Sequence, residues 1–228
     1  AVTVLAAGDI ATCDNDGDER TAALLAAYPD APILAVGDLA YSDGTAFEFA
    51  NCYAPSWGVF KSRTYPVPGN HEYHTTNAGP YYAYFGALAG PAGNAASRGY
   101  YSFDLGGWHI IALNSEQDIA ANGAQLKWLR ADLAANQKAC ILAYFHRPRF
   151  VASQQYSDQF DVMPFWEALY AAGADVVLNG HDHSYQRYAP MDPSGQPDRA
   201  GIREFVVGTG GRPLYTLKAD GRREAANG

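Results

Sequence analysis

Short apolar runs alternate along the chain with longer segments of helical spacing. The apolar runs predict strands at residues 2–7, 33–36, 65–67, 139–145, 175–178 and 204–207. The longer segments predict helices at residues 19–27, 81–88, 125–135 and 160–172, and a helix or irregular segment near 47–53. Runs at 100–105 and 108–113 flank Gly106-Gly107, which predicts a hairpin. This alternation predicts an α/β fold in which helices cover sheets, with an antiparallel part near the hairpin.

Polar clusters follow five of the predicted strands. They read GDI at residues 8–10, GDLAY at 37–41, GNHE at 69–72, HRP at 146–148 and NGHDHSY at 179–185. In open α/β sheets, ligands bind beyond the carboxyl ends of the strands. All but one of the clusters carry a glycine beside the polar residue, which lets the backbone turn sharply. We therefore expect these clusters to meet at one edge of the fold.

The clusters supply seven candidate metal ligands. They are Asp9, Asp38, Tyr41, Asn70, His146, His181 and His183. Oxygen and nitrogen donors without a thiolate suit zinc, iron or manganese. Seven ligands are too many for one tetrahedral ion, but they make two sets of four if one carboxylate is shared. Two cations about 3.5–4 Å apart need an anion between them, and Asp38 is the natural bridge.

The ordered set of motifs resembles the signature of metallophosphoesterases, and more narrowly that of the purple acid phosphatase branch. The resemblance runs from Asp9 to His183. It implies a four-layer α/β/β/α sandwich, the calcineurin-like metallophosphoesterase fold, with a dinuclear metal site at the strand ends. Carried over by position, it implies a first metal held by Asp9, Tyr41 and His183 and a second held by Asn70, His146 and His181.

The branch assignment depends on two positions. The wider family has a histidine where Ala11 stands, whereas Tyr41 occupies the last place of G-D-x-x-Y, as in the purple branch. A tyrosinate that replaces a neutral histidine offsets the extra charge of a ferric ion. The resemblance therefore implies Fe(III) at the Asp9/Tyr41/His183 site and a divalent ion (zinc, iron or manganese) at the Asn70/His146/His181 site.

The resemblance implies hydrolysis of phosphate esters by a metal-bound hydroxide, with Asp38 and His71 as the catalytic residues. His71 is the candidate proton donor to the leaving oxygen, or else a cationic clamp on phosphate. Asn70, His71 and Arg147 are the predicted substrate contacts. Relatives often carry further histidines after the H-x-P motif, and this chain has Arg147-Pro148-Arg149 there. A phosphomonoesterase is the leading hypothesis. A phosphodiesterase and a non-catalytic metal- or phosphate-binding module are the alternatives.

The overall charge narrows the choice of partner. The chain has 228 residues, with 16 basic and 24 acidic side chains and a net charge of -8. This excess argues against non-specific binding to nucleic acid or to an anionic membrane. The expected partner is a small phosphorylated substrate or inorganic phosphate, attracted locally by a metal site. The sequence contains no apolar run long enough for a transmembrane helix, and it leaves the oligomeric state open.

We expect residues 1–228 to form one catalytic domain. Residues 218–228 are polar and are not expected to join the core, and the sequence leaves open whether C-terminal strands are missing. The glycine-rich run at 208–213 starts like a phosphate loop, but Pro213 and the lack of a following helix predict only a turn. The chain opens directly in a strand, so any leader has been removed or never existed. The localisation we expect is extracytoplasmic or secreted, with the leader already removed.

Three cysteines bear on the compartment. Cys140 lies in an apolar run and is expected to be a buried thiol. Cys13 and Cys52 lie in loops after motif-bearing strands. The sequence leaves open whether these two are bonded, because spacing alone does not decide connectivity.

Overall fold

Two β-sheets form the centre of the molecule in the computed structural model, which describes residues 2–90 and 99–224. The first sheet is parallel, with strand order β1-β2-β3, and consists of β1 (Leu5–Ala7), β2 (Ile33–Val36) and β3 (Thr64–Val67). The second sheet, in the order β4-β5-β6-β7-β9-β8, consists of β4 (Tyr101–Leu105), β5 (Trp108–Ala112), β6 (Cys140–Tyr144), β7 (Val176–Asn179), β9 (Arg203–Val207) and β8 (Tyr185–Arg187). Only the two edge strands, β4 and β8, pair antiparallel, so the hairpin prediction is confirmed.

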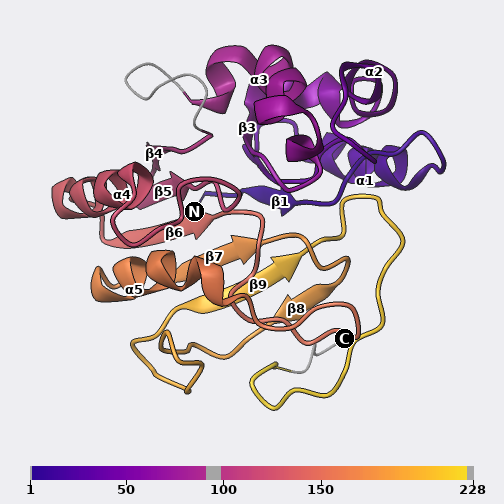
Figure 1. Ribbon diagram of the computed structural model, residues 1–228. Helices are drawn as coiled ribbons and strands as arrows, with labels where there is room; N and C mark the ends of the chain where they lie inside the picture. Colours follow the sequence, from indigo (N-terminus) through magenta and orange to yellow (C-terminus); the bar gives the residue numbers. More distant parts are fainter. Residues whose placement is uncertain (1, 91–98, 225–228) are drawn as a thin grey trace.

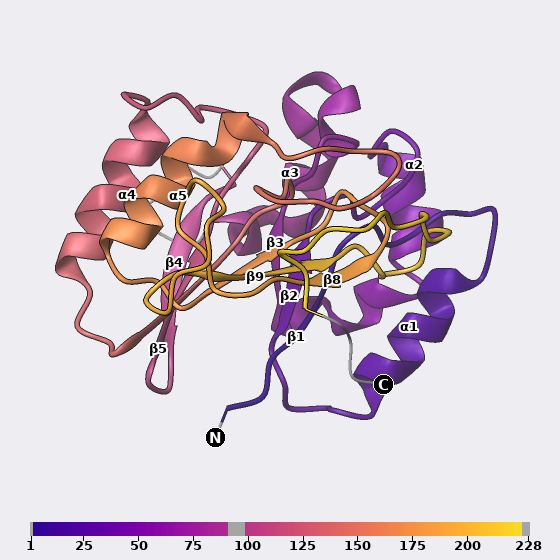
Figure 2. The same cartoon turned by 90° about the horizontal axis from the view of Figure 1, so that it is seen from below.

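Helices cover the outer face of each sheet (Figures 1 and 2). The first sheet is covered by the N-terminal helices α1 (Gly17–Ala26), α2 (Ala46–Glu48) and α3 (Gly79–Phe85). The second is covered by α4 (Ala124–Ala135) and α5 (Met163–Ala171). Shorter pieces are a π-helix at Phe49–Tyr53 and 3-10 helices at Trp57–Arg63, Glu72–His74, Thr76–Ala78, Gly86–Ala89 and Phe160–Val162. None of the described helices is both long and apolar enough to cross a bilayer.

The strand residues alternate between two cores. In β2, Leu34 and Val36 join Leu142 and Tyr144 of β6 in the core between the sheets. Their neighbours point outward: those of β2 pack under α1, and those of β6 under α4 and α5. This period of two is the geometry of a strand buried on both faces. The four layers α/β/β/α are therefore confirmed, whereas the assignment of all 228 residues to one domain stays a prediction.

Strand β8 is the one described strand that the hydrophobic pattern did not predict. Its sequence, Tyr185-Gln186-Arg187, has exposed, buried and exposed positions and no apolar run. The strand exists because it pairs with β9 at the edge of the sheet. The polar tail is likewise held by polar contacts: Arg222 pairs with Asp158 at 2.6 Å. The prediction that the tail stays out of the core agrees with this up to Glu224, and residues 225–228 lie outside the described residues.

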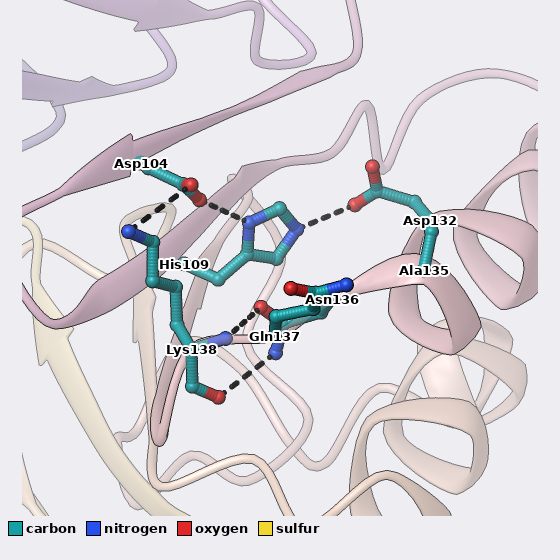
Figure 3. A pocket seen from close by; sticks show the side chains of 7 residues that line it. All are labelled: Asp104, His109, Asp132, Ala135, Asn136, Gln137 and Lys138. Atoms are coloured by element: carbon teal, nitrogen blue, oxygen red, sulfur yellow. Dashed lines mark hydrogen bonds and ion pairs between the residues drawn. The ribbon is translucent and has the colours of Figure 1, made fainter.

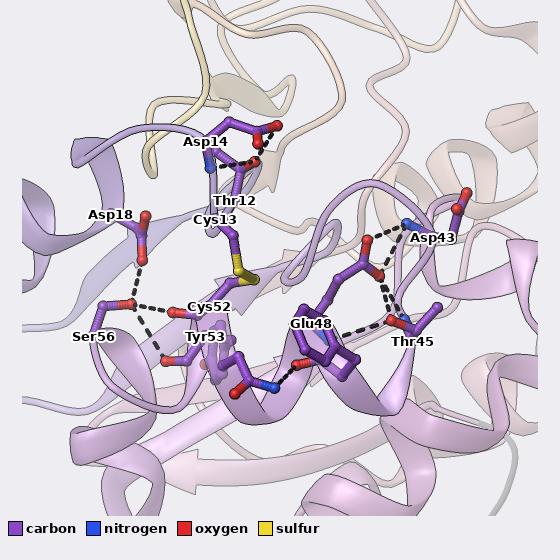
Figure 4. The surroundings of a disulfide bond; sticks show 12 residues. Thr12, Cys13, Asp14, Asp18, Asp43, Thr45, Glu48, Cys52, Tyr53 and Ser56 are labelled. Atoms are coloured by element: carbon purple, nitrogen blue, oxygen red, sulfur yellow. Dashed lines mark hydrogen bonds between the residues drawn. A yellow bond between two sulfur atoms is a disulfide. The ribbon is translucent and has the colours of Figure 1, made fainter.

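A disulfide joins Cys13, after the first ligand motif, to Cys52 of the π-helix (Figure 4). The pairing that the sequence left open is thus present in the structure. Cys140 is free, and it is half-buried rather than buried because it is the first residue of β6, where the strand emerges from the core.

Candidate metal centre

The predicted ligands lie beyond the carboxyl ends of five strands. Asp9, Asp38 and Asn70 follow β1, β2 and β3 of the first sheet, and His146 and His181 follow β6 and β7 of the second. These strands are parallel within each sheet, so their ends share one edge. Residues that are far apart in sequence therefore meet at the rim where the two sheets face each other.

The first ligand set converges on the phenolic oxygen of Tyr41. Tyr41 Oη lies 2.8 Å from Asp9 Oδ1, 3.1 Å from Asp38 Oδ2 and 3.2 Å from His183 Nε2. His183 Nε2 is 3.4 Å from Asp9 Oδ1. The four side chains are buried. Two buried carboxylates, a phenol and an imidazole thus share one point in space, which is a donor set that suits a first-row metal.

The second ligand set contains donor atoms that no protein group satisfies. Asn70 Oδ1, His146 Nε2 and His181 Nδ1 are buried and have no hydrogen-bond partner among the described residues. Ligand atoms of Asp38, His146 and His181 all lie within 4.8 Å of one another. A buried polar atom without a partner costs about 1–3 kcal/mol. His146 Nε2 lies 3.1 Å from Asp38 Oδ2, whereas Asn70 Oδ1 and His181 Nδ1 have no partner among the described residues. Because buried lone pairs and a carboxylate gather in one place, this set fits a cation.

Asn70 is brought to the site by the glycine before it. A Cβ atom at Gly69 would collide with Asp38 Oδ1 and would lie 2.8 Å from Cγ of His146. Only glycine lets this backbone come so close to the two side chains. In the third motif, Gly69 is thus needed for close packing, and Asn70 supplies the predicted ligand.

Carbonyl oxygens orient two of the histidines. His146 Nδ1 lies 3.0 Å from the carbonyl oxygen of Val36, and His183 Nδ1 lies 3.2 Å from that of Pro213. A carbonyl only accepts, so each Nδ1 carries a proton, and Nε2 is the ring atom that is left to bind a cation. Both Nε2 atoms face the aspartates of the site. This arrangement is how metal-binding histidines are usually fixed.

Backbone strain also gathers at the predicted ligands. Asp9, Asp38 and His181 have φ angles of 61°, 52° and 69°, which non-glycine residues rarely adopt. Such conformations cost about 1–3 kcal/mol each and persist where the surroundings enforce them, most often at functional sites. Here the strain turns each side chain from the strand end into the shared rim.

The charges of the site act on one another. Burial alone would raise the pKa of Asp38, but the neighbouring His146 and His71 outweigh burial and hold it well below its usual range. Burial lowers the pKa of His146, and Asp38 overrides this and raises it to about 10. Burial and the charge of His146 lower the pKa of His181 to about 2. Burial, with Asp9 and Asp38, raises the pKa of Tyr41.

His71 and Arg147 lie at the rim of the site. The backbone N–H of His71 donates to Asp38 Oδ1 at 2.9 Å, and its Nε2 lies 3.7 Å from Asp38 Oδ2. Arg147 Nε and Nη2 both donate to the carboxylate of Glu116 at 2.9 Å. Two of the three guanidinium nitrogens of Arg147 are therefore already engaged, and its contact with phosphate stays a prediction.

Glu72 is a residue whose role sequence reasoning missed. Its buried carboxylate accepts N–H groups from Asp38 at 3.0 Å, Leu39 at 2.8 Å and Gly69 at 2.8 Å. It therefore ties the loop after β2 to the loop after β3. A glutamate that directly follows Asn70 and His71 in the motif was the available signal, but its partners are not visible in sequence.

Two tyrosines were missed as well. Tyr156 stacks on His181 and Tyr215 stacks on His183, each with ring centres 4.2 Å apart. Both come from loops that carry no ligand motif. The two tyrosine rings cover the imidazole rings of His181 and His183 and limit how those imidazoles can rotate.

A polar pocket of about 450 Å³ lies at the opposite end of the second sheet, beside His109 at the start of β5 (Figure 3). His109 Nδ1 contacts Asp104 at 2.9 Å and its Nε2 contacts Asp132 at 2.8 Å. Both ring nitrogens are taken up, so this histidine offers no free donor to a metal. His109 is thus a strand residue held between two carboxylates.

The family model described as calcineurin-like phosphoesterase matches residues 2–185. The chain belongs to this family. Among curated proteins, it is 29% identical over 188 residues to purple acid phosphatase 23 of Arabidopsis thaliana and 28% identical over 211 residues to purple acid phosphatase 15. These matches cover 68% and 78% of this chain. The resemblance to the purple acid phosphatase branch is therefore confirmed.

A solved structure agrees with the fold. The purple acid phosphatase isolated from yellow lupin (Lupinus luteus) seeds superposes with a TM-score of 0.78 at 17% identity, over 98% of this chain and 47% of that one. The chain spans 41% and 40% of the lengths of the two curated relatives. Family membership implies a dinuclear metal site, and the buried Asp38, His146 and His181 form a candidate cluster for it.

Proposed function

We propose that this chain is a metal-dependent hydrolase of phosphate esters that holds two cations and prefers phosphomonoesters. The observation that carries the proposal is the group of buried Asn70 Oδ1, His146 Nε2 and His181 Nδ1 atoms at the rim shared by both sheets. None of them makes a hydrogen bond to a described residue, and His146 Nε2 faces the carboxylate of Asp38 at 3.1 Å. They occur in a chain of the calcineurin-like phosphoesterase family, beside a second cluster around Tyr41. If these polar residues only supported the fold, their buried atoms would be expected to form hydrogen bonds within the protein.

In this proposal Asp38 is shared by two cation sites. Its Oδ2 atom lies 3.1 Å from Tyr41 Oη and 3.1 Å from His146 Nε2, so one carboxylate oxygen touches both ligand sets. Asp9, Tyr41 and His183 would hold Fe(III), for which an anionic phenolate and carboxylates are suitable ligands. Asn70, His146 and His181 would hold zinc, divalent iron or manganese. Bound there, the cations would attract the phosphate group and bring the pKa of a water molecule close to neutrality.

His71 is proposed to move the proton that the leaving oxygen needs. Its Nδ1 lies 2.5 Å from the carbonyl oxygen of Ser42, so that nitrogen carries a fixed proton. The other nitrogen, Nε2, faces Asp38 and is the atom that can give a proton to substrate. The side chain is 27% exposed, so a substrate can reach it. An imidazole suits this task because it titrates near neutral pH.

Arg147 is proposed to contact the phosphate through its remaining nitrogen. Glu116 holds Nε and Nη2, which fixes the plane of the guanidinium group. The charge of Glu116 also offsets part of the positive charge of Arg147. We therefore expect Arg147 to position substrate weakly, and Asn70 and His71 to make the closer contacts.

The compartment proposed is an oxidising one outside the cytoplasm, for a secreted or extracytoplasmic protein. The Cys13–Cys52 disulfide supports it, because such bonds persist mainly in oxidising surroundings. The proposed partner is a small phosphorylated molecule or inorganic phosphate.

The test compares two substrates and two asparagine variants. The wild-type protein, loaded with iron and zinc or with manganese, is assayed with p-nitrophenyl phosphate and with bis(p-nitrophenyl) phosphate. Faster turnover of the monoester is expected, and faster turnover of the diester would favour a phosphodiesterase. Asn70→Ala should abolish turnover, whereas Asn122→Ala, at an exposed loop position, should not change it. Full metal loading without turnover of either ester would indicate a non-catalytic binding module.

A further inference from the structure

The loop of residues 208–212, Gly208-Thr209-Gly210-Gly211-Arg212, follows β9 and packs on the first ligand motif. The N–H of Gly210 donates to the carbonyl of Gly8 at 2.8 Å, and the N–H of Arg212 donates to the carbonyl of Asp9 at 3.1 Å. The loop thus holds the backbone on both sides of the Asp9 Cα. The sequence alone predicts only a turn here, because these contacts join segments some 200 residues apart.

The glycines of this loop are needed for close backbone packing. A Cβ at Gly210 would lie 2.5 Å from the carbonyl oxygen of Gly8, and one at Gly211 would lie 2.5 Å from that of Ile10. Real Cβ atoms do not come so close to backbone. Thr21 of α1 donates its hydroxyl to the carbonyl of Gly210, which anchors the loop from the other side. The glycines therefore serve to seat the loop against Asp9, and no phosphate is needed to explain them.

At the end of the loop, the guanidinium group of Arg212 lies over the ring of Tyr41. The central guanidinium carbon of Arg212 lies 4.4 Å from the centre of that ring. The imidazole of His71 lies at the same distance, 4.4 Å between ring centres, and His183 makes an edge contact at 5.9 Å. Arg212 Nε is buried and has no hydrogen-bond partner among the described residues. A guanidinium nitrogen that is buried and unpaired is costly, so the position of the half-buried Arg212 calls for a reason other than ion pairing.

We propose that Arg212 is a positioning residue of the metal centre, and that the 208–212 loop sets the first ligand site by fixing the Asp9 backbone and the Tyr41 ring together. The inference rests on the proposed function, because it takes Asp9 and Tyr41 as ligands of one cation. A guanidinium plane over an aromatic face restrains the ring and adds a fixed positive charge beside the phenol. The loop thereby acts on two ligands that come from different strands.

The test measures the metal site itself. Metal-free wild-type protein and the variants Arg212→Ala, Arg212→Lys and Gly210→Ala are titrated with zinc in competition with a chromophoric chelator. The same proteins are reconstituted with iron, and the visible absorption band of the tyrosinate–iron pair is recorded. Gly107→Ala, where an added Cβ meets nothing within 4 Å, is the matched glycine control. Thermal unfolding and circular dichroism verify that each variant is folded.

Arg212→Ala and Gly210→Ala should each weaken metal binding by about 10-fold or more and shift the visible band, as loss of a group that orients a ligand does. Arg212→Lys keeps the charge but loses the planar stack, so an intermediate effect is expected. Gly107→Ala should match the wild type. If Arg212→Ala does not fold, Arg212→Lys decides by the same readouts.

Folded variants with wild-type affinity and an unshifted band would overturn the inference. If the wild type also hydrolyses phosphate esters in that case, the proposed function stands and only the positioning role fails. A wild-type protein that takes up no metal would overturn both. If the wild type binds zinc or manganese and no iron, the metal affinities of the variants alone decide whether Arg212 positions the ligands.

Discussion

The carboxylate of Asp38 lies 3.1 Å from Nε2 of His146, although the two residues follow strands of different sheets. Their side chains are 2% and 0% exposed. Packing of the two sheets against each other brings the strand ends together, so the contact depends on the tertiary fold. The proposed bridge between two cations is located at this contact.

Replacing Asp38 by asparagine tests the bridge directly. Asp38→Asn keeps the size of the side chain and removes the negative charge that two cations would share. We expect metal affinity to fall by about 100-fold or more, since even groups that merely orient ligands contribute 10- to 100-fold. The measurement is metal content after dialysis together with a competition titration. Asp161→Asn, at an exposed position, is the matched control. Unchanged affinity in Asp38→Asn would rule out the bridging role.

Replacing His71 separates a proton donor from a ligand. His71→Ala should leave metal content unchanged and lower kcat by about 100-fold for an alkyl phosphate, the low end for general acid catalysis. The loss should be smaller for p-nitrophenyl phosphate, because its leaving group needs less help from a proton. Asn122→Ala, at an exposed loop position, serves as control. Equal losses with both substrates would instead point to a cationic clamp on phosphate.

Replacing Glu72 tests how the two ligand loops are held together. Glu72→Gln puts an amide nitrogen among four backbone N–H donors that now point at carboxylate oxygens. At least one donor is then left without an acceptor, and we expect unfolding free energy to fall by about 1–3 kcal/mol. Denaturant unfolding of the metal-free protein gives the value. Glu167→Gln, on the exposed side of α5, should have little effect. A stability equal to that of the wild type would show that the loops do not need this carboxylate.

Removing the disulfide should lower stability by about 4 kcal/mol. The bond closes a loop with a sequence separation of 39 residues, and loop-closure entropy gives an effect of that order. The double variant Cys13→Ser/Cys52→Ser is compared with Cys140→Ser, which removes the free thiol instead. Thermal unfolding with and without a reductant gives the measurement. We expect the reductant to lower the Tm of Cys140→Ser and to leave the Tm of the double variant unchanged. An equal change of Tm in both variants would contradict this prediction.

The pair of aspartates around His109 predicts a pH-dependent stability. Burial lowers the pKa of His109, but its bonds to Asp104 and Asp132 outweigh burial and raise it above the ordinary value. Because the pKa of His109 is higher in the folded than in the unfolded protein, protonated His109 stabilises the fold. This stabilisation is fully present below the unfolded pKa of about 6.5. It is lost as the pH rises through the folded value.

We therefore expect His109→Asn to lower the Tm more at pH 5.5 than at pH 9. The measurement is thermal unfolding of wild type and variant at both pH values. The ring lies in the polar pocket away from the metal centre, and Lys138 is the only other charged group that lines this pocket among the described residues. His74→Asn, an exposed histidine with a single carboxylate partner, is the comparison. An equal difference in Tm at the two pH values would refute the linkage.

Local pattern was a good guide wherever an element buries an apolar face. Strand β2 was predicted with the boundaries that the structure has, Ile33–Val36, because all four residues are buried between two layers. Helix α4 differs from its prediction by one residue. Strand β8 could not be found in this way, since its polar residues become a strand only through pairing with β9. The π-helix at Phe49–Tyr53 was also beyond reach, because its departure from α-geometry leaves no mark in the apolar pattern.

The residues of the candidate site likewise fall into those that the sequence could identify and those that it could not. Asp9, Asp38 and His146 could be singled out because each stands next to a strand end in an ordered series of short motifs. Glu72 and Arg212 could not be assigned roles. Some partners of Glu72 lie on a neighbouring loop, and those of Arg212, Tyr41 and Asp9, lie more than 150 positions earlier in the chain. Arg147 was assigned to phosphate without knowledge of Glu116, which engages two of its three guanidinium nitrogens.

By itself the sequence determined the chemistry of the site: which oxygen and nitrogen donors exist, and that each follows a strand whose end points to one edge. Those features are local, because a strand, a turn and a donor are specified within a few residues. Only the tertiary structure decided which donors share a point in space, which are left without partners, and which neighbours hold them. Distances between the two sheets depend on how the cores pack, and no short stretch of sequence contains that information.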